Sequence, residues 1–315
     1  MQDFHTPQGS LVHQLLMRRP DTGLFDRFTY AEALPDDQVE VRWFGTAGFS
    51  LTYRGAVLLI DPFITRPSVR KTLSRPLVSD EAALARWVPR ADVIACGHSH
   101  HDHILDVPAI ARRTGAMVLG SRSSCNLCRA YGVGEEQLRE LCAPATVSHG
   151  PFCVTVLPSR HGRALLNRVP LEGSIPPGLR GPLRMRAFRT DETFALKVVV
   201  SEGDRRVTFV QLSSADFTDE TFMGEHCDVL MPCIVGRHRR PGYTAALLSL
   251  LQPKVVVPHH YDDFFLPLGT PLRELPRADL AGFQREVRGA RVPCRIVTPY
   301  RLETIRFTLD GDVVE

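Results

Sequence analysis

The stretch His98-Ser99-His100-His101-Asp102-His103 is the part of this sequence that most narrows its fold and chemistry. It follows the apolar run Asp92–Cys96, which predicts a buried β-strand. Residues two apart in an extended chain point the same way, so His98 and His100 can bind one metal ion. The turn that follows would carry Asp102 and His103 to the other side, where they can hold a second ion. The spacing of His98, His100, Asp102 and His103 within six residues therefore predicts a metal site, and His101 between them is expected to face solvent or to support a ligand.

Two ions need more ligands than this cluster supplies. His161 comes shortly after the predicted strand Phe152–Leu157, and His260 comes shortly after the predicted strand Val255–Val257. Both positions lie at strand ends, as ligands on one shared rim would. His259 remains an alternative to His260, because Pro258 obscures the direction of the side chains that follow it.

A carboxylate that bridges two ions is expected in the loop after the predicted strand Arg206–Leu212. Asp216 is the nearest acid there, and the position of Ser214 is the alternative for the bridging place. Asp61 is expected either to tie a ligand loop to the sheet or to form a turn. Tyr261, Asp262 and Asp263 adjoin His260 and are candidates for proton donation, for support of a ligand or for capping a loop.

Imidazole and carboxylate ligands suit Zn²⁺, with Mn²⁺ and Fe²⁺ as alternatives. Two such ions can share a water and lower its pKa, which predicts attack of a metal-bound hydroxide on an ester-like bond. Asp102, Asp216 and His260 are the candidate catalytic residues. The sequence has no G-x-S-x-G signature, so a covalent serine mechanism is disfavoured.

The segment 162–190 is rich in arginine, proline and glycine and has only one acid, Glu172. It begins directly after His161, and arginine side chains bind phosphate or carboxylate groups through two hydrogen bonds. We therefore expect a substrate-facing loop and an anionic small molecule, either a phosphodiester or a lactone. A solvated flexible loop is the alternative. The candidate substrate-binding residues are Arg163, Arg184, Arg186 and Tyr261.

The cluster resembles the H-x-H-x-D-H signature of the metallo-β-lactamase superfamily. The strand Ala56–Ile60 before Asp61-Pro62, and the turn Gly45–Gly48, are similar to features of the same family. The branches most similar to this sequence are the ascorbate-6-phosphate lactonases and the N-acyl-phosphatidylethanolamine phospholipase D-like enzymes.

The resemblance implies an αββα sandwich, with two packed mixed sheets and outer helices, and a dinuclear site. His98, His100 and His161 would hold one metal, and Asp102, His103 and His260 the other. The family's bridging aspartate normally follows a glycine directly, whereas Ser213-Ser214 stands at that place here and Asp216 comes two residues later.

Composition places few further limits on function. The chain has 315 residues, a hydrophobic fraction of 43% and a net charge of +3, which gives no reason to expect nucleic acid as a partner. We expect an extension over residues 1–37 and one domain over 38–315, with helices that include Glu135–Leu141. The polar start and eight scattered cysteines favour the cytoplasm as the location.

Two other functions remain open from the sequence. One is a metal-binding sensor without turnover, because the bridging ligand is doubtful. The other is a peripheral phospholipase D-like enzyme that contacts membranes through Leu11–Arg19, although we do not favour membrane contact. The pair Cys125 and Cys128 is predicted to be buried rather than to bind metal or act in redox chemistry. No pattern in the sequence indicates the oligomeric state.

Overall fold

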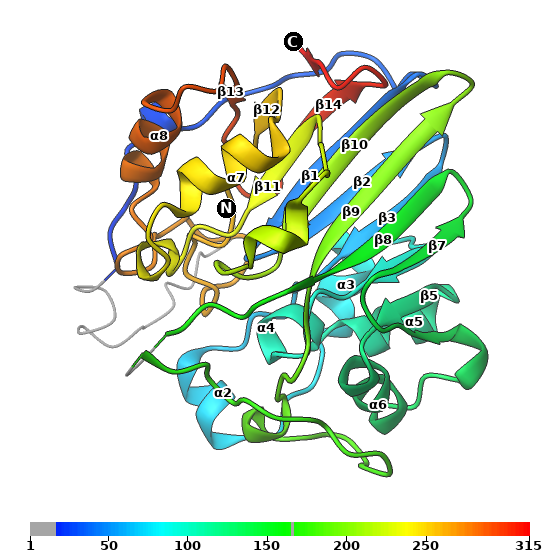
Figure 1. Ribbon diagram of the computed structural model, residues 1–315. Helices are drawn as coiled ribbons and strands as arrows, with labels where there is room; N and C mark the ends of the chain where they lie inside the picture. The colour runs from blue at the N-terminus through cyan, green and yellow to red at the C-terminus, as the bar shows by residue number, and fades with distance from the viewer. Residues whose placement is uncertain (1–16, 165–166) are drawn as a thin grey trace, which may run out of the picture.

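The structure is a computed structural model that describes residues 17–164 and 167–315. Its strands form two mixed sheets (Figure 1). The first sheet has the order β15-β14-β1-β2-β3-β4-β5-β6. Its strands are β1 (Gln38–Gly45), β2 (Gly48–Tyr53), β3 (Ala56–Ile60), β4 (Val93–Ala95), β5 (Met117–Gly120), β6 (Leu138–Glu140), β14 (Thr304–Thr308) and β15 (Val313–Val314).

The second sheet has the order β13-β12-β11-β10-β9-β8-β7. Its strands are β7 (Ala145–His149), β8 (Phe152–Ser159), β9 (Thr193–Glu202), β10 (Arg205–Leu212), β11 (Val229–Pro232), β12 (Val255–Val256) and β13 (Arg295–Ile296). In both sheets an antiparallel meander continues into parallel strands, from β3 to β6 and from β10 to β13. Parallel strands place their carboxyl ends at one edge, so each sheet presents several loops there.

Helices cover the outer sides of the sheets. Figure 1 shows α3, α5 and α6 on one side of the molecule and α7 and α8 on the other. The helices are α2 (Val69–Ser74), α3 (Glu81–Trp87), α4 (His101–Ile104), α5 (Val107–Thr114), α6 (Arg122–Ala130), α7 (Tyr243–Leu251) and α8 (Leu280–Arg288). Short 3₁₀ helices occur at Thr22–Leu24, Glu135–Gln137, Met185–Ala187, Asp219–Phe222 and Arg237–Arg239. The predicted αββα sandwich is confirmed.

Local sequence explains why several of these elements form. Strand β1 alternates between buried and partly buried side chains along most of its length, the pattern of a strand with one face on a core. Helix α3 begins after Asp80, whose carboxylate accepts hydrogen bonds from the amides of Ala82 and Ala83 at 3.1 and 3.0 Å. The interior between the sheets holds large apolar side chains such as Trp43 and Phe209.

The helix expected over Glu135–Leu141 is wrong. The structure has a single 3₁₀ turn at Glu135–Gln137 followed by strand β6. Strand β6 pairs in parallel with β5, so Leu138 lies opposite Val118 and Glu140 opposite Gly120. Strand pairing thus supplies the backbone hydrogen bonds that a helix would have supplied, and it overrides the helical preference of this polar stretch.

The described part of the N-terminal segment packs against the end of the chain. The amide of Asp26 donates to the carbonyl of Thr298 at 2.9 Å, and the Phe25 ring lies 5.2 Å from the Tyr300 ring. Most of the amphipathic stretch Leu11–Arg19 lies outside the described residues. In the part of the chain that the structure describes, no helix is long and apolar enough to cross a membrane.

The cysteine pair Cys125 and Cys128 lies in helix α6, where both side chains are buried. Burial raises the pKa of the Cys125 thiol to about 12 and that of Cys128 well above its usual value. Thiols are reactive and bind metal as thiolates, so these two are poorly suited to either role.

Candidate metal centre

Two strand ends bring His98, His100 and His161 together. His98 and His100 follow β4, and His161 follows β8 of the other sheet. The three side chains each offer a nitrogen, and these nitrogens lie within 4.8 Å of one another. The ring centres are 4.8 Å apart for His98 and His100 and 4.6 Å apart for His100 and His161. This spacing suits three ligands around one ion.

A second group joins Asp102, His103 and His260. Asp102 and His103 lie on the short helix α4, and His260 lies in the loop after β12. The Asp102 Oδ2 atom is 3.7 Å from His103 Nε2 and 3.5 Å from His260 Nε2. The rings of His98 and His103 are centred 3.8 Å apart, so the two groups lie side by side. The six residues proposed for two metals therefore meet at one place.

Asp61 supports the centre from the end of β3. Its Oδ1 accepts from the amide of Gly97 at 2.7 Å, and its Oδ2 lies 2.8 Å from His103 Nδ1. Asp61 also lies close enough to His98 and His103 to form a third possible ligand group. Because both of its oxygens already have partners, it is better suited to orienting His103 than to binding an ion itself.

Hydrogen bonds select which ring nitrogen faces each group. The carbonyls of Pro170 and Gly162 can only accept, so His100 donates through Nε2 at 2.9 Å and His161 donates through Nδ1 at 2.7 Å. His103 meets the carboxylate of Asp61 through Nδ1. The other nitrogen of each ring is thereby left for a ligand role, as in histidines that bind metals.

Some nitrogens of the centre are buried without a hydrogen-bond partner among the described residues. They are both ring nitrogens of His98 and Nδ1 of His260. A buried polar atom without a partner costs free energy, and a bound cation would remove that cost for one ring nitrogen of His98. The donor set of neutral imidazoles and carboxylates is also one that zinc favours. The residues present thus fit a divalent metal ion.

Burial and neighbouring charges hold four side chains of the centre in the protonation states in which they can bind a metal ion. Burial lowers the pKa of His100 to about 3 and that of His161 to about 4, and it holds the pKa of His98 well below its usual value. Burial works against ionisation of Asp102, but the adjacent His103 and His260 hold its pKa well below the usual range. Three neutral imidazoles and an ionised carboxylate are the forms that bind metals.

The structure does not bring Asp216 into any of these groups. Its Oδ1 accepts from the amide of Phe217 at 2.8 Å and lies 3.6 Å from Nε of Arg240. The alternative, Ser214, uses its hydroxyl to accept from the amide of Gly162 at 2.9 Å. Among residues 17–164 and 167–315, the carboxylates near the groups are therefore Asp102 and Asp61, and the expected bridging role of Asp216 has no geometric support.

The structure separates His260 from its rival His259. His259 is fully buried, and its Nε2 lies 3.0 Å from the carbonyl of Met231, away from the three groups. Tyr261 also faces the interior: its ring lies 4.8 Å from the Trp43 ring, and its hydroxyl donates to the carbonyl of Pro299 at 3.4 Å. The arrangement does not support contact between Tyr261 and a substrate, because its side chain is completely buried.

The predicted substrate-binding arginines divide into two sets. Arg163 lines a pocket of about 330 Å³ beside His161, together with Arg160. Arg184 instead donates to the carbonyl of Ser74 at the end of α2, and Arg186 is exposed on a 3₁₀ turn. Only the first set adjoins a candidate ligand.

The segment 162–190 lies against the centre at several points. Besides the contact between Pro170 and His100, the hydroxyl of Ser99 donates to the carbonyl of Arg189. Phe188 is fully buried, and its ring is centred 6.5 Å from that of His101. Its described part is therefore anchored beside the ligands rather than free in solvent.

Sequence reasoning missed the role of Arg66, whose guanidinium lies buried behind His260 and bonds to Asp262 at 2.7 Å. The two partners are 196 residues apart in the chain. No local pattern around Arg66 indicates such a pairing.

Comparison with known proteins supports the fold. No family model matches the chain. A UPF0173 metal-dependent hydrolase from Anaeromyxobacter sp. (strain K) is 27% identical over 266 residues, which cover 80% of this chain and 84% of the relative. That relative is named as a metal-dependent hydrolase, without a substrate.

Two solved structures have a similar fold. Igni18, a metallo hydrolase from the archaeon Ignicoccus hospitalis, has a TM-score of 0.56 at 19% identity, covering 86% of this chain and 98% of that one. The metallo-β-lactamase fold protein YhfI from Bacillus subtilis has a TM-score of 0.51 at 14% identity, covering 86% of this chain and 100% of its own. With its two mixed sheets, outer helices and histidine-rich strand ends, the chain has the metallo-β-lactamase fold.

Proposed function

We propose that the protein is a metal-dependent hydrolase that binds two metal ions and cleaves an ester-like bond of an anionic small molecule. The observation that carries this proposal is the pair of adjacent ligand groups, whose ligand atoms converge and in which His98, His100 and His161 are held neutral by burial. The metal-dependent hydrolases among its relatives support the same chemistry.

The residues divide between the two ions as follows. His98, His100 and His161 would hold one ion, and Asp102, His103 and His260 the other. Zinc is the first choice, with manganese or iron as alternatives. When bound, a pair of ions lowers the pKa of a shared water and polarises the bond to be cleaved. The protein's own contribution is to fix these side chains and to shield them, since most of them are buried.

The pocket beside His161 supports a polar substrate. Its lining combines the arginines 160 and 163 with the carboxylates of Glu172, Asp191 and Asp216. The charge of Asp216 is offset by Arg240, which lies outside the pocket lining. Arginine side chains bind phosphate and carboxylate oxygens, so a phosphodiester or a phosphorylated lactone is the substrate class we propose. The reactions of ascorbate-6-phosphate lactonases and of phospholipase D-like enzymes both act on substrates of this class.

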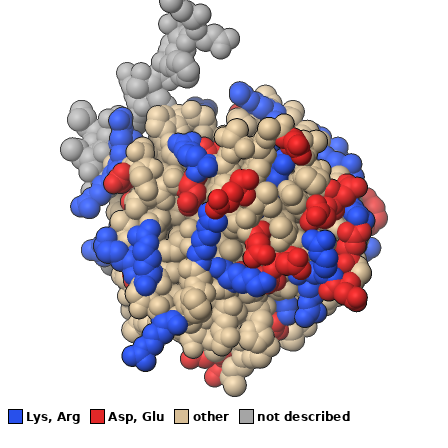
Figure 2. Space-filling model, turned by 90° about the horizontal axis from the view of Figure 1, so that it is seen from above, with Lys and Arg blue, Asp and Glu red and all other residues tan. Residues whose placement is uncertain are grey.

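Large nucleic acids are not part of this proposal. On the face that Figure 2 shows, Lys and Arg side chains are interspersed with Asp and Glu. Binding to a polyphosphate backbone depends on a continuous basic surface. A net charge of +3 over 315 residues agrees with the mixture seen on that face.

Metal analysis of the purified protein tests the proposal. We expect close to two metal equivalents per chain, and a His98→Ala, His100→Ala variant should lose at least one of them. An Arg237→Met variant, altered at a buried arginine of the 3₁₀ helix Arg237–Arg239 that bonds to Glu286 of α8, is the control and should keep both. Full metal content in the double variant, or none in the wild type, would contradict the proposed centre.

Activity separates a hydrolase from a metal-binding sensor. The metal-loaded protein should hydrolyse bis-p-nitrophenyl phosphate, and chelation should abolish that turnover. A protein that binds two ions and turns over neither this diester nor lactones would fit the sensor instead.

A further inference from the structure

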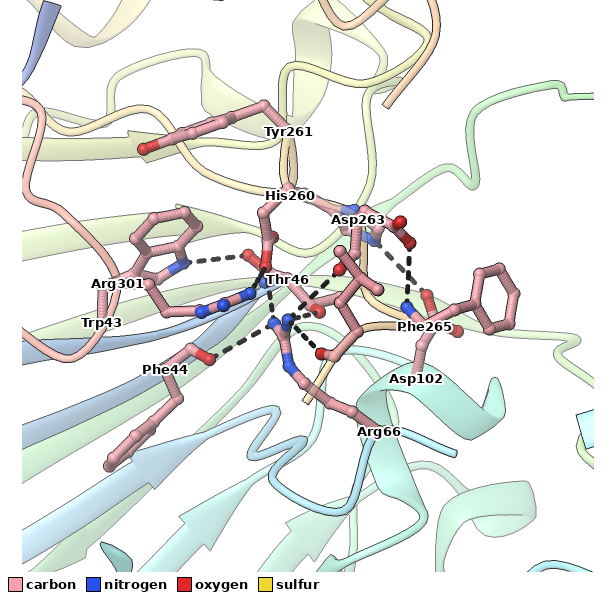
Figure 3. A network of polar contacts seen from close by, with 12 residues as sticks. Trp43, Phe44, Thr46, Arg66, Asp102, His260, Tyr261, Asp263, Phe265 and Arg301 are labelled. Atoms are coloured by element: carbon pink, nitrogen blue, oxygen red, sulfur yellow. Dashed lines mark hydrogen bonds and ion pairs between the residues drawn. The ribbon is translucent and has the colours of Figure 1, made fainter. Parts of the chain in front are cut away.

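A cluster of buried charges lies next to the loop that carries His260. The side chains of Arg66, Asp262 and Arg301 are 0%, 0% and 1% exposed. Asp262 Oδ2 accepts from Arg66 Nη2 at 2.7 Å and from Arg301 Nη1 at 3.4 Å. In Figure 3 the guanidinium groups of Arg66 and Arg301 point toward each other beside Thr46. We call these three residues the buried triad.

The triad holds the turn at Thr46 through two contacts. The amide of Thr46 donates to Asp262 Oδ1 at 2.7 Å, and its hydroxyl accepts from Arg66 Nη2 at 3.2 Å. Thr46 in turn reaches the metal centre, because its carbonyl accepts from the amide of His260 at 2.9 Å. One residue thus connects the buried charges to a candidate ligand (Figure 3).

The backbone at these contacts is held in an unfavourable conformation. His260 has φ +59°, Thr46 has φ +52° and Arg66 has φ +44°, all in the left-handed region. For residues other than glycine this region costs on the order of 1–3 kcal/mol each, and it persists only where surrounding contacts impose it. The left-handed turn at His260 aims the ring so that Nε2 lies 3.5 Å from Asp102 Oδ2.

Gly45 has no side chain, and the triad occupies the space that a side chain at this position would fill. A Cβ atom at this position would lie 1.9 Å from Arg66 Nη2 and 2.5 Å from Asp262 Oδ2. The glycine of the turn Gly45–Gly48 therefore admits the guanidinium against the backbone. Arg66 also donates to the carbonyl of Phe44 at 3.3 Å, on the other side of Gly45.

Stability alone gives a weak reason for such a cluster. Removing ions from water costs several kcal/mol each, and apolar residues of similar volume are often at least as stabilising. A buried ionic cluster instead fixes the relative positions of its side chains, because each buried charge must keep its partners to remain compensated.

We infer that Arg66, with Asp262 and Arg301, is a positioning device that fixes the left-handed backbone at His260 through Thr46. It thereby selects the orientation in which His260 can share an ion with Asp102 and His103. The inference rests on the proposed dinuclear function, since it concerns one of the two ligand groups. It assigns no such role toward His98, His100 and His161, because the hydrogen bonds of the triad and Thr46 described above run to none of them.

Substitution of Arg66 tests this inference in two ways. Zinc titration of the chelated protein, with competition by a chromophoric chelator, should show two binding steps in the wild type. In Arg66→Met we expect one step to weaken by about 10–100-fold, the range seen when residues that orient ligands are changed. The other step should be unchanged. Arg66→Lys keeps the charge but not the fork of donors, and should give an intermediate loss.

Hydrogen exchange of the metal-free protein supplies the second readout. The amide of His260 should exchange at least about tenfold faster in Arg66→Met, because its bond to Thr46 is no longer held. Arg237→Met is the matched control: Arg237 is also buried and paired, with Glu286 at 2.9 Å. It should lower stability without changing either the zinc steps or the exchange of His260.

The outcomes separate the inference from the proposed function. If Arg66→Met and Arg66→Lys bind zinc in two steps with wild-type affinities, and the amide of His260 exchanges at the wild-type rate, the inference is overturned. Equal weakening of both steps would also overturn it, because the effect would then be general. A wild type without two zinc steps would refute the dinuclear function, and the exchange of His260 would still decide whether the triad holds the turn.

Discussion

The contact between Asp61 and His103 shows how single side chains prepare the centre. Burial acts against a charge on His103, but the carboxylates of Asp102 and Asp61 raise its pKa above the usual value. A carboxylate on Nδ1 also fixes the tautomer and makes the opposite nitrogen a better ligand. Asp61 itself has φ +41°, which aspartate and asparagine tolerate better than most residues.

Replacement of Asp61 by asparagine isolates this effect. Asp61→Asn keeps the size and the positive φ but removes the charge. We expect the affinity for the ion held by Asp102, His103 and His260 to fall by about 10–100-fold. Asp92→Asn is the control, because Asp92 accepts from the amide of Val57 at 2.7 Å far from the ligands. Equal zinc affinities for Asp61→Asn and wild type would show that the tautomer is fixed by other contacts.

Single residues also show the limits of sequence reasoning. His98, His100, Asp102 and His103 could be predicted because strand and turn geometry acts over a few residues. Asp216 could not be excluded in the same way, because its partner Arg240 lies 24 positions later and is brought near by the fold. For the same reason the sequence around Arg66 gave no signal, since its role depends on Asp262, which lies 196 residues later in the chain.

Strand ends were the predictable part of the architecture. β4, β8 and β12 end close to where the apolar runs of the sequence end, so the sequence alone places the loops that carry His98, His161 and His260. The polar stretch 135–141 was not predictable in this way, because its periodicity is short and pairing with β5 decides its conformation. Local preference yields to tertiary pairing in such a segment.

The loop after β8 carries a prediction about substrate charge. Arg160 and Arg163 line the pocket beside His161, whereas Arg184 is anchored on α2. Arg160→Ala and Arg163→Ala should raise KM for bis-p-nitrophenyl phosphate more than they lower kcat, because they remove binding to a charge that is present in both ground and transition states. The neutral ester p-nitrophenyl acetate should be little affected.

Arg184→Ala is the matched control for this element. It removes an arginine of the same segment that does not line the pocket, so KM for the diester should stay near the wild-type value. Added salt should weaken the effect of the pocket arginines to the extent that they are exposed. Equal losses on the charged and the neutral substrate would mean that these arginines support the fold rather than bind charge.

The arrangement of the whole molecule makes the centre depend on both sheets. β3 and β4 of the first sheet supply Asp61, His98 and the cluster that follows, while β8 and β12 of the second supply His161 and His260. The candidate ligands therefore meet only when the two sheets are packed, and a bound ion would link the two sheets to each other. Metal binding and folding would be coupled for this reason.

The same arrangement predicts how the metal-free protein responds to acid. In the folded state the pKa values of His100 and His161 are about 3 and about 4, and that of His98 is also lowered. Histidines in the unfolded chain titrate near about 6.5. Between these values the unfolded chain binds more protons than the folded one, so stability must fall as the pH is lowered from about 6.5 toward about 4. His100 and His161 each contribute on the order of 1–2 kcal/mol to this loss at pH 5, and His98 acts in the same direction. His103 acts in the opposite sense, because its raised pKa favours the folded state at low pH, but the buried histidines with a lowered pKa outnumber it.

Urea denaturation of the chelated protein, measured from pH 7 to pH 4.5, checks this expectation. The midpoint should fall steeply with acid in the wild type and less steeply in His161→Gln, because one group with a lowered pKa has been removed. His226→Gln, at an exposed histidine, should keep the wild-type slope. Zinc should oppose the loss at each pH while it remains bound, since the ion competes with protons for the same nitrogens. A wild-type midpoint that does not change over this range, or an equal slope in His161→Gln, would show that the buried imidazoles do not control the acid response.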